Sequence, residues 1–152
     1  MRLSFAVLSA LIAFALPAAA QAIDAKAWVG KYPFDKIGGA TFWGALGDRL
    51  DGTVGPQLAR AIRGGWGPQT PVKFSDGWTI AWICKAHDCG NNNVTVAINA
   101  NGRMVACIER SEEKPPIRWQ EIGHRVVAQD KACQDDPAAF VEDMRRLGIL
   151  DR

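Results

Sequence analysis

The chain has 152 residues, of which 48% are hydrophobic and 22% charged, and its formal net charge at pH 7 is +2. This near balance argues against nucleic acid or an anionic membrane surface as a partner, because both require clustered positive charge. The composition is that of an ordinary globular protein, and the sequence shows no repeats or low-complexity tracts.

The first 22 residues have the pattern of a secretory signal peptide. Arg2 precedes an apolar run over residues 3–16, and Ala-Gln-Ala at 20–22 supplies the small-x-small pattern of a cleavage site. The run is shorter than the roughly 20 apolar residues that a membrane span needs. No cysteine directly follows the site, which argues against a lipid anchor. We therefore expect a signal peptide over 1–22, no membrane anchor, and a single exported domain over 23–152. A cut after position 20 and an uncleaved anchor are the alternatives.

The residues from 24 to 63 are predicted to form short helices separated by glycine-rich breaks. Apolar side chains recur at helical spacing in two stretches. These are Phe42, Trp43, Leu46 and Leu50, followed by Leu58, Ala59 and Ile62.

From residue 70 the hydrophobic period changes to two, which is typical of β-strands. Asp76-Gly77 and Asn101-Gly102 each separate two alternating runs, and such dipeptides are strong hairpin signals. The segment from 117 to 122 is expected to add an edge strand, because two prolines precede it.

A last helix is predicted between Asp136, which can cap it, and Gly148, which ends it, with Pro137 in its first position. Together the elements predict an α+β domain, with an antiparallel sheet of about five strands and helices packed on one face. The heptapeptide CKAHDCG (residues 84–90) falls between the two hairpins, and we expect it to protrude from the end of the sheet.

Cys84 and Cys89 enclose four residues, three of which (Lys85, His87 and Asp88) can carry charge. An even number of cysteines in an exported chain favours disulfides. A simple surface staple would explain the cysteines but not the contents of the ring, since turns generally use Gly, Asn, Asp or Pro. A small ring also fixes its side chains before a partner arrives, which suits a recognition loop that donates hydrogen bonds to an acidic cleft.

Two other interpretations of the ring stay open at this point. A metal site would use Cys84, His87 and Cys89, but zinc needs a fourth ligand, and His124 is the one other histidine. Oxidation would also remove both thiolates. A catalytic role for His87 lacks a recognisable nucleophile motif, and a disulfide-bonded cysteine cannot attack a substrate. On the residues alone, both interpretations are weaker than a surface staple or a recognition loop.

The hexapeptide Cys-Lys-Ala-His-Asp-Cys, followed by Gly90, resembles the signature loop of the Ivy family, periplasmic inhibitors of vertebrate c-type lysozyme. The usual family loop is Cys-Lys-Pro-His-Asp-Cys, so Ala86 stands where the family has proline. The flanking Gly-Gly at 64–65 and Pro-Gln-Thr at 68–70 are also similar. The resemblance extends from about residue 62 to residue 119.

The resemblance implies a protein that is not an enzyme and that has no catalytic residue, no metal and no cofactor. It also implies inhibition of lysozyme by insertion of the Cys84–Cys89 loop into its cleft, where two carboxyl groups act in catalysis. His87 maps onto the key histidine of the family, and its two ring nitrogens can bond both carboxyls at once. Lys85 adds positive charge. Asp88 is expected to orient the ring by accepting bonds from backbone N–H groups or from His87. Ala86 lacks the stiffness of proline, which predicts somewhat weaker binding.

Other conspicuous residues have structural interpretations. Cys107 and Cys133 most simply pair with each other, and swapped pairing with the loop cysteines is the alternative. His124 is expected to be an exposed or hydrogen-bonded structural residue. The six tryptophans are expected to pack mostly in the core rather than to form a sugar-binding platform, with Trp66 the best candidate for an exposed one that borders the loop.

By resemblance, the partner is c-type lysozyme, the location is the periplasm and the role is evasion of host defence. Three other functions stay open: inhibition of the cell's own lytic transglycosylases, a periplasmic hydrolase that uses His87, and a peptidoglycan-binding module. Some family members are dimers, and a homodimer is therefore a further open alternative.

Overall fold

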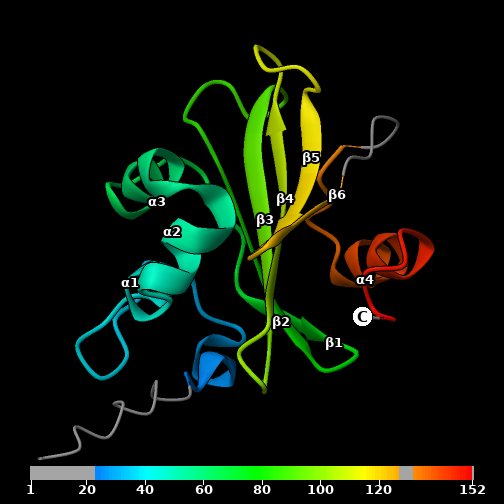
Figure 1. Cartoon of the computed structure of the whole chain (residues 1–152). Helices are drawn as coiled ribbons and strands as arrows, with labels where there is room; N and C mark the ends of the chain where they lie inside the picture. Colours follow the sequence, from blue (N-terminus) through cyan, green and yellow to red (C-terminus); the bar gives the residue numbers. More distant parts are fainter. Residues whose placement is uncertain (1–22, 127–131, 152) are drawn as a thin grey trace, which may run out of the picture.

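The computed structural model of the chain describes residues 23–126 and 132–151 (Figure 1). The predicted signal peptide at 1–22 lies outside the described residues. Within them, no helix combines the length and the apolar character that a membrane crossing requires.

The first half of the described chain forms short helices. These are the 3-10 helix η1 (Ala25–Trp28) and the α-helices α1 (Phe42–Ala45), α2 (Asp48–Val54) and α3 (Pro56–Arg63). The side chain of Thr41 begins α1 by accepting a hydrogen bond from the backbone N–H of Gly44. Pro56 occupies the first position of α3, where its missing N–H removes no helical bond. Because new helices begin directly after Thr41 and at Pro56, this region forms several short helices in place of one long helix.

Six strands form one antiparallel sheet in the order of the chain. They are β1 (Lys73–Ser75), β2 (Trp78–Cys84), β3 (Asn92–Asn99), β4 (Met104–Arg110), β5 (Ile117–Glu121) and β6 (His124–Val126). Both predicted hairpins are present, with β1 and β2 joined at Asp76-Gly77 and β3 and β4 joined across Asn101-Gly102. The strand predicted at 117–122 is β5, but it is not an edge strand, because β6 pairs with its outer side. Three residues are too few to show an alternating pattern, so β6 escaped prediction.

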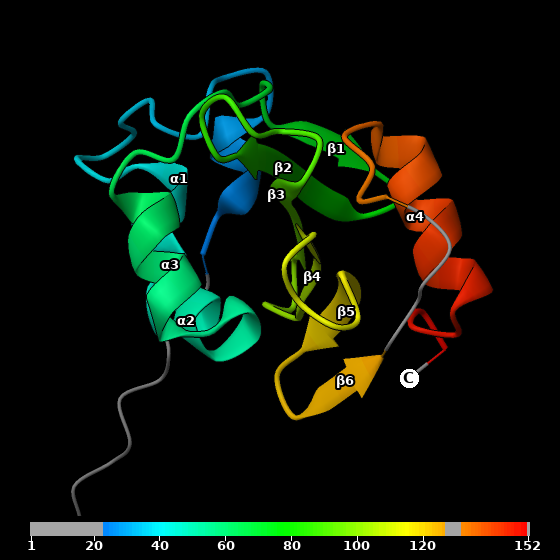
Figure 2. The ribbon, with the colours of Figure 1, turned by 90° about the horizontal axis from the view of Figure 1, so that it is seen from above.

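The α+β class is confirmed, but the helices cover both faces of the sheet rather than one. Figures 1 and 2 show α1–α3 on one side of the sheet and α4 (Pro137–Arg146) on the other. Successive residues of a strand point to opposite faces, and both faces of the central strands are apolar. Along β4, Ala106 belongs to the cluster under α1–α3, whereas Val105 belongs to the cluster under α4.

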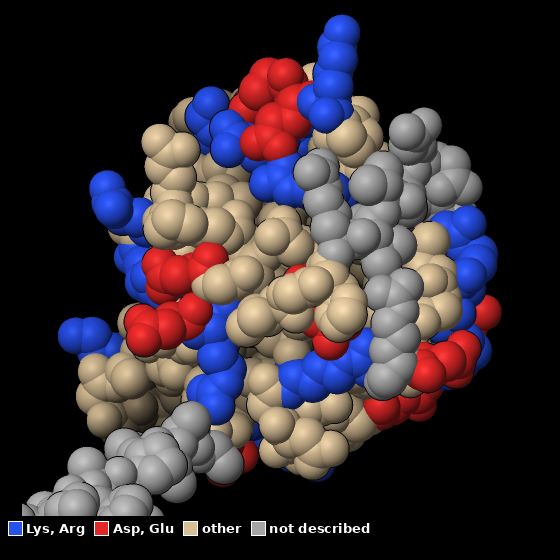
Figure 3. Space-filling view, viewed as in Figure 1, with Lys and Arg blue, Asp and Glu red and all other residues tan. Residues whose placement is uncertain are grey.

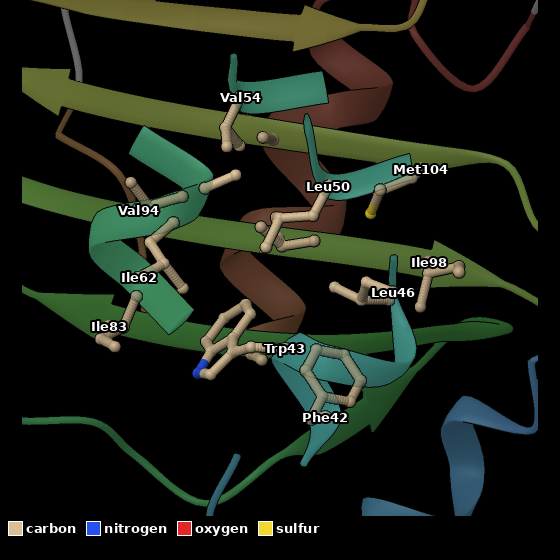
Figure 4. Close-up of a cluster of buried hydrophobic side chains, with 14 of the residues drawn as sticks. Phe42, Trp43, Leu46, Leu50, Val54, Ile62, Ile83, Val94, Ile98 and Met104 are labelled. Carbon is tan, nitrogen blue, oxygen red and sulfur yellow. The ribbon is translucent and has the colours of Figure 1, made fainter. Parts of the chain in front are cut away.

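Aromatic side chains fill both cores. Figure 4 shows Phe42 and Trp43 of α1 packed with aliphatic side chains of the helices and the sheet. On the opposite face, the rings of Trp119 and Phe140 lie 4.7 Å apart between centroids. Four of the tryptophans are buried, which confirms core packing as their main role; they are Trp28, Trp43, Trp78 and Trp119.

A disulfide fixes the position of α4. Cys107 of β4 is bonded to Cys133, with the two Cα atoms 5.5 Å apart. The hydroxyl of Thr95 in β3 donates to the carbonyl oxygen of Gln134 at 2.7 Å, one residue further along. Asp136 then caps α4 by accepting from the backbone N–H of Ala139, as the sequence predicts. These contacts tie the start of α4 to the middle of the sheet.

Candidate functional site

The loop singled out in the sequence connects β2 to β3 and protrudes from the end of the sheet. Cys84 is the last residue of β2 and pairs with Asn93 of β3. A disulfide joins Cys84 to Cys89 across a Cα–Cα distance of 4.8 Å. The turn between β4 and β5 lies at the same end of the sheet, because β3 and β4 are antiparallel neighbours (Figure 1). The loop is therefore a short covalent ring that rises from a rigid base.

Inside the ring, four residues make a tight turn. The backbone N–H of Asp88 donates to the carbonyl oxygen of Lys85 at 3.0 Å. His87, in the third position, has a φ of 63°, whereas Ala86, in the second, is not among the residues with positive φ. This is the pattern of a type II turn, in which the third position favours glycine. Among residues with a side chain, histidine is one of the few that adopts this conformation with some frequency.

The side chains of the ring differ sharply in exposure. Lys85, Ala86 and His87 are exposed, Asp88 and Cys89 are half-buried, and Cys84 is fully buried. The tip of the turn therefore presents the imidazole and the ammonium group to solvent, while the buried Cys84 anchors the ring to the sheet.

Asp88 points toward the base of the loop. One carboxylate oxygen accepts from the side-chain amide of Asn91 at 2.9 Å, and the other accepts from that of Asn92 at 2.6 Å. These two bonds, together with the charge of Lys85, hold the pKa of the Asp88 carboxyl below its ordinary value. The sequence led us to expect backbone N–H groups or His87 as its partners. Instead, the asparagine amides take that place, because the chain reverses directly after the ring and brings their side chains under the carboxylate.

Lys85 lies near the same carboxylate but interacts with it weakly. Its Nζ is 3.9 Å from a carboxylate oxygen of Asp88, and its side chain is 56% exposed. A long exposed ion pair of this kind contributes little to stability. The ammonium group is therefore available to a partner.

Two further segments support the ring from outside. The carbonyl oxygen of Pro68 accepts from the backbone N–H of Cys84 at 3.0 Å. The backbone at Gly67 lies so close to the ring that a Cβ added at this glycine would be 2.6 Å from the Cα of Ala86. On the other side, the N–H of Ser111 in the β4–β5 turn donates to the carbonyl oxygen of Asn91 at 2.9 Å. The segments on either side therefore hold the ring against the body of the protein.

These supporting residues were missed in the sequence. The run Asn91-Asn92-Asn93 leads from the ring into β3, and no supporting role is predicted for it from the sequence. Two features could have marked it. Three consecutive asparagines are unusual at the start of a strand, since asparagine is depleted in strands, and each carries an amide that can grip a nearby carboxylate. Gly67 left no signal of its own, because its role depends on a contact between distant parts of the chain.

A shallow hollow of about 320 Å³ lies beside the ring. Trp66 borders it together with Lys85 and Arg110, so this tryptophan does lie near the loop, although it is half-buried and also packs on the core. Figure 3 shows acidic and basic side chains side by side at this end of the molecule rather than a patch of one sign. A larger hollow of about 710 Å³ lies away from the loop, against η1 and α1.

The other candidate ligands do not gather around the ring. Among residues 23–126 and 132–151, no group of three or more His, Cys, Asp or Glu side chains could hold a metal ion. His124 lies in β6 and is exposed. Both loop cysteines are used in the disulfide. What the arrangement offers chemically is a fixed, exposed hydrogen-bonding surface.

A comparison with protein-family models matches residues 45–128 to the family described as inhibitor of vertebrate lysozyme (Ivy). The matched span is more than half of the chain and contains the whole Cys84–Cys89 ring with its supporting segments. No curated protein and no solved structure matches the chain.

Proposed function

The chain belongs to the Ivy family of inhibitors of vertebrate lysozyme, and from this premise we propose that it acts by inserting the Cys84–Cys89 ring, with His87 at the tip, into the active-site cleft of c-type lysozyme. As a member of this family the protein is an inhibitor of an enzyme and not itself an enzyme. The mode of inhibition and the roles of single residues are our proposal.

One observation carries the proposal: His87 is exposed and has a backbone conformation that glycine would adopt more readily. Backbone strain of this kind tends to persist where the surrounding structure enforces it and function requires it. Here the disulfide and the bonds to Asp88 enforce it. A residue kept at the tip of a turn despite its backbone preference is best explained by what its side chain does.

The chemistry of the tip suits an acidic cleft. The imidazole of His87 has two nitrogens on opposite sides of the ring, so it can bridge two carboxyl groups. Lys85 adds a positive charge next to it. Asp88 would repel such a cleft, but its carboxylate is turned away and bonded to Asn91 and Asn92. Inhibition then follows from occupancy, because the catalytic groups cannot reach their substrate.

The proposed location is the periplasm, reached through the predicted signal peptide at 1–22. Both cysteine pairs are oxidised in the structure, which fits a compartment that permits disulfides. In that compartment the protein would meet host lysozyme at the peptidoglycan that the enzyme degrades. Evasion of host defence is the corresponding role.

The test is a titration of c-type lysozyme in a cell-wall clearing assay with the wild-type protein, His87→Gly and His124→Ala. We expect stoichiometric inhibition by the wild type and a loss of at least about 100-fold for His87→Gly, because each charge-assisted hydrogen bond contributes roughly 1.5–3 kcal/mol. The melting temperature of His87→Gly should be unchanged or higher, since glycine relieves the positive φ. His124→Ala is the matched control and should inhibit normally. Full potency of His87→Gly would exclude the proposed role of the imidazole.

The same proteins should be assayed against a lytic transglycosylase and for binding to purified cell wall. We expect lysozyme to be inhibited at lower inhibitor concentrations than the transglycosylase. The reverse order would make control of the cell's own wall turnover the better explanation. Binding to cell wall without any lysozyme would indicate a peptidoglycan-binding module. Sedimentation of the inhibitor alone tests the homodimer.

A further inference from the structure

We propose that Asn92, assisted by Asn91, is a positioning residue that holds the His87 turn in its binding conformation, as a second restraint besides the Cys84–Cys89 disulfide. This inference rests on the proposed function, since it concerns the same loop. It adds a second, non-covalent constraint on the tip, supplied by side chains outside the ring.

The first observation is where the two amides grip the loop. Asp88 is the fourth residue of the turn and directly follows His87. Both of its carboxylate oxygens are occupied, one by Asn91 and one by Asn92, and its carbonyl oxygen accepts the backbone N–H groups of the same two residues at 3.1 and 2.9 Å. Four bonds therefore fix the residue next to His87. A group held at so many points leaves the preceding torsion little freedom.

The second observation is that Asn92 is itself immobilised. It is 3% exposed and is the first residue of β3, where it pairs with Arg110 of β4. Its backbone carbonyl also accepts the N–H of Lys85 at 2.9 Å, at the opposite end of the turn. Asn92 thus contacts both ends of the four-residue turn from a position within the sheet. Asn91 is exposed, so it can only assist.

The third observation connects Asn92 to the β4–β5 turn. The pKa of Glu112 is held below its ordinary value by a backbone hydrogen bond and by Arg110, and the amide of Asn92 contributes in the same direction. Arg110 binds the carboxylate of Glu112 at 2.6 Å. The N–H of Ser111 in the same turn donates to the carbonyl oxygen of Asn91 at 2.9 Å, so the asparagine segment is also bound to the β4–β5 turn.

The disulfide and the asparagines restrain different degrees of freedom. The disulfide fixes the separation of residues 84 and 89, the two ends of the ring. It does not by itself fix the orientation of the peptide planes inside the ring. The bonds from Asn91 and Asn92 instead hold the carboxylate and the carbonyl oxygen of Asp88, and so fix this residue relative to β3. Because either restraint alone still limits the same four-residue turn, removing both should weaken inhibition by more than the product of the two single effects.

The experiment compares Asn91→Ala, Asn92→Ala and the double variant, each with the disulfide intact and in a Cys84→Ala/Cys89→Ala background. Two quantities are measured: the inhibition constant against lysozyme, and the hydrogen-exchange rate of the Asp88 amide in the free protein. We expect Asn92→Ala to weaken inhibition about tenfold and to accelerate Asp88 exchange by a similar factor, with about threefold effects for Asn91→Ala. Asn101→Ala, an asparagine in the exposed turn at the other end of β3, is the matched control and should change neither quantity.

Equal inhibition and equal Asp88 exchange for the wild type and the double asparagine variant would overturn the inference. Strictly multiplicative losses on combining the asparagine and cysteine changes would overturn the claim that the two restraints act on one turn. If Asn92→Ala does not fold, Asn91→Ala and Asn92→Ser carry the same comparison. Because Asp88 exchange is read without lysozyme, it tests the positioning role even if the wild-type protein fails to inhibit the enzyme.

Discussion

The two disulfides of this protein occupy opposite kinds of surroundings. Cys84–Cys89 closes a ring with a sequence separation of 5 at the surface, next to exposed side chains. Cys107–Cys133 spans a separation of 26 and is buried in the core between the sheet and α4. The first determines the shape of a few exposed residues, and the second determines where a whole helix packs. Under the proposed function, the same covalent bond serves recognition in one place and stability in the other.

Chain entropy predicts how this difference appears in measurements. A cross-link destabilises the unfolded chain more when it closes a longer loop, by roughly 3.5 kcal/mol for the Cys107–Cys133 span and roughly 2 kcal/mol for the short ring. The short ring therefore contributes less to the free energy of unfolding than the long one, but it fixes the conformation of exposed residues. The comparison can be tested by removing each disulfide in turn.

The largest effect on stability is expected for Cys107→Ala/Cys133→Ala. The free energy of unfolding should fall by about 3.5 kcal/mol, because a long loop is released and α4 loses its tether to β4. Urea denaturation followed by tryptophan fluorescence measures this change. The folded fraction should still inhibit lysozyme with nearly wild-type potency, because the ring lies elsewhere. A loss below about 1 kcal/mol would contradict the assigned role of this disulfide.

Removal of the surface disulfide should lower stability less than removal of the buried one, but should weaken inhibition more. For Cys84→Ala/Cys89→Ala we expect a loss of about 2 kcal/mol in unfolding free energy and inhibition weakened about tenfold, because the turn must be ordered on binding. The same denaturation and clearing assays apply, with the core disulfide variant as the control. Unchanged inhibition after complete removal would mean that the preformed ring does not contribute to binding.

The smallest effect is expected for Ala86→Pro, which restores the residue found in the usual family loop. Proline suits the second position of a type II turn, and Gly67 leaves the facing side without a Cβ. We expect a gain of about 0.4–1 kcal/mol, seen as a two- to fivefold lower inhibition constant. Weaker inhibition would instead show that the proline ring collides with the backbone at Gly67.

Much of the fold was accessible from the sequence because its signals are local. The turns at Asp76-Gly77 and Asn101-Gly102 depend on residues that favour particular backbone torsions. The cap at Asp136 and the end of α4 near Gly148 likewise depend on neighbours along the chain. The loop itself was found because its two cysteines are close in sequence.

The side on which α4 packs was missed, although the sequence contains a parity signal for it. Met104, Ala106 and Ile108 of β4 face the first group of helices. Cys107 lies between two of them and must point to the opposite face, because strand side chains alternate. Its bond to Cys133 therefore brings the following helix to that face. Hydrophobic periodicity shows which side of a helix is apolar. The face of the sheet on which that helix packs is shown here only by the disulfide between a strand and the segment before the helix.

The supports of the candidate site were harder to predict. Gly67 and Ala86 are distant in sequence and meet only in the folded chain. Asn92 pairs with Asp88 across a chain reversal whose geometry depends on the type of turn. Contacts of this kind depend on precise tertiary placement, and no local propensity indicates them.

The left-handed backbone at position 87 also limits how this position can change during evolution. Glycine, asparagine, aspartate and histidine are the residues that tolerate such torsions best. Of these four, only histidine carries a ring with two separated nitrogen atoms. The backbone geometry therefore permits few residue types at position 87, and an acidic target would favour histidine among them. Fewer substitutions should be tolerated here than the solvent exposure of the side chain alone suggests.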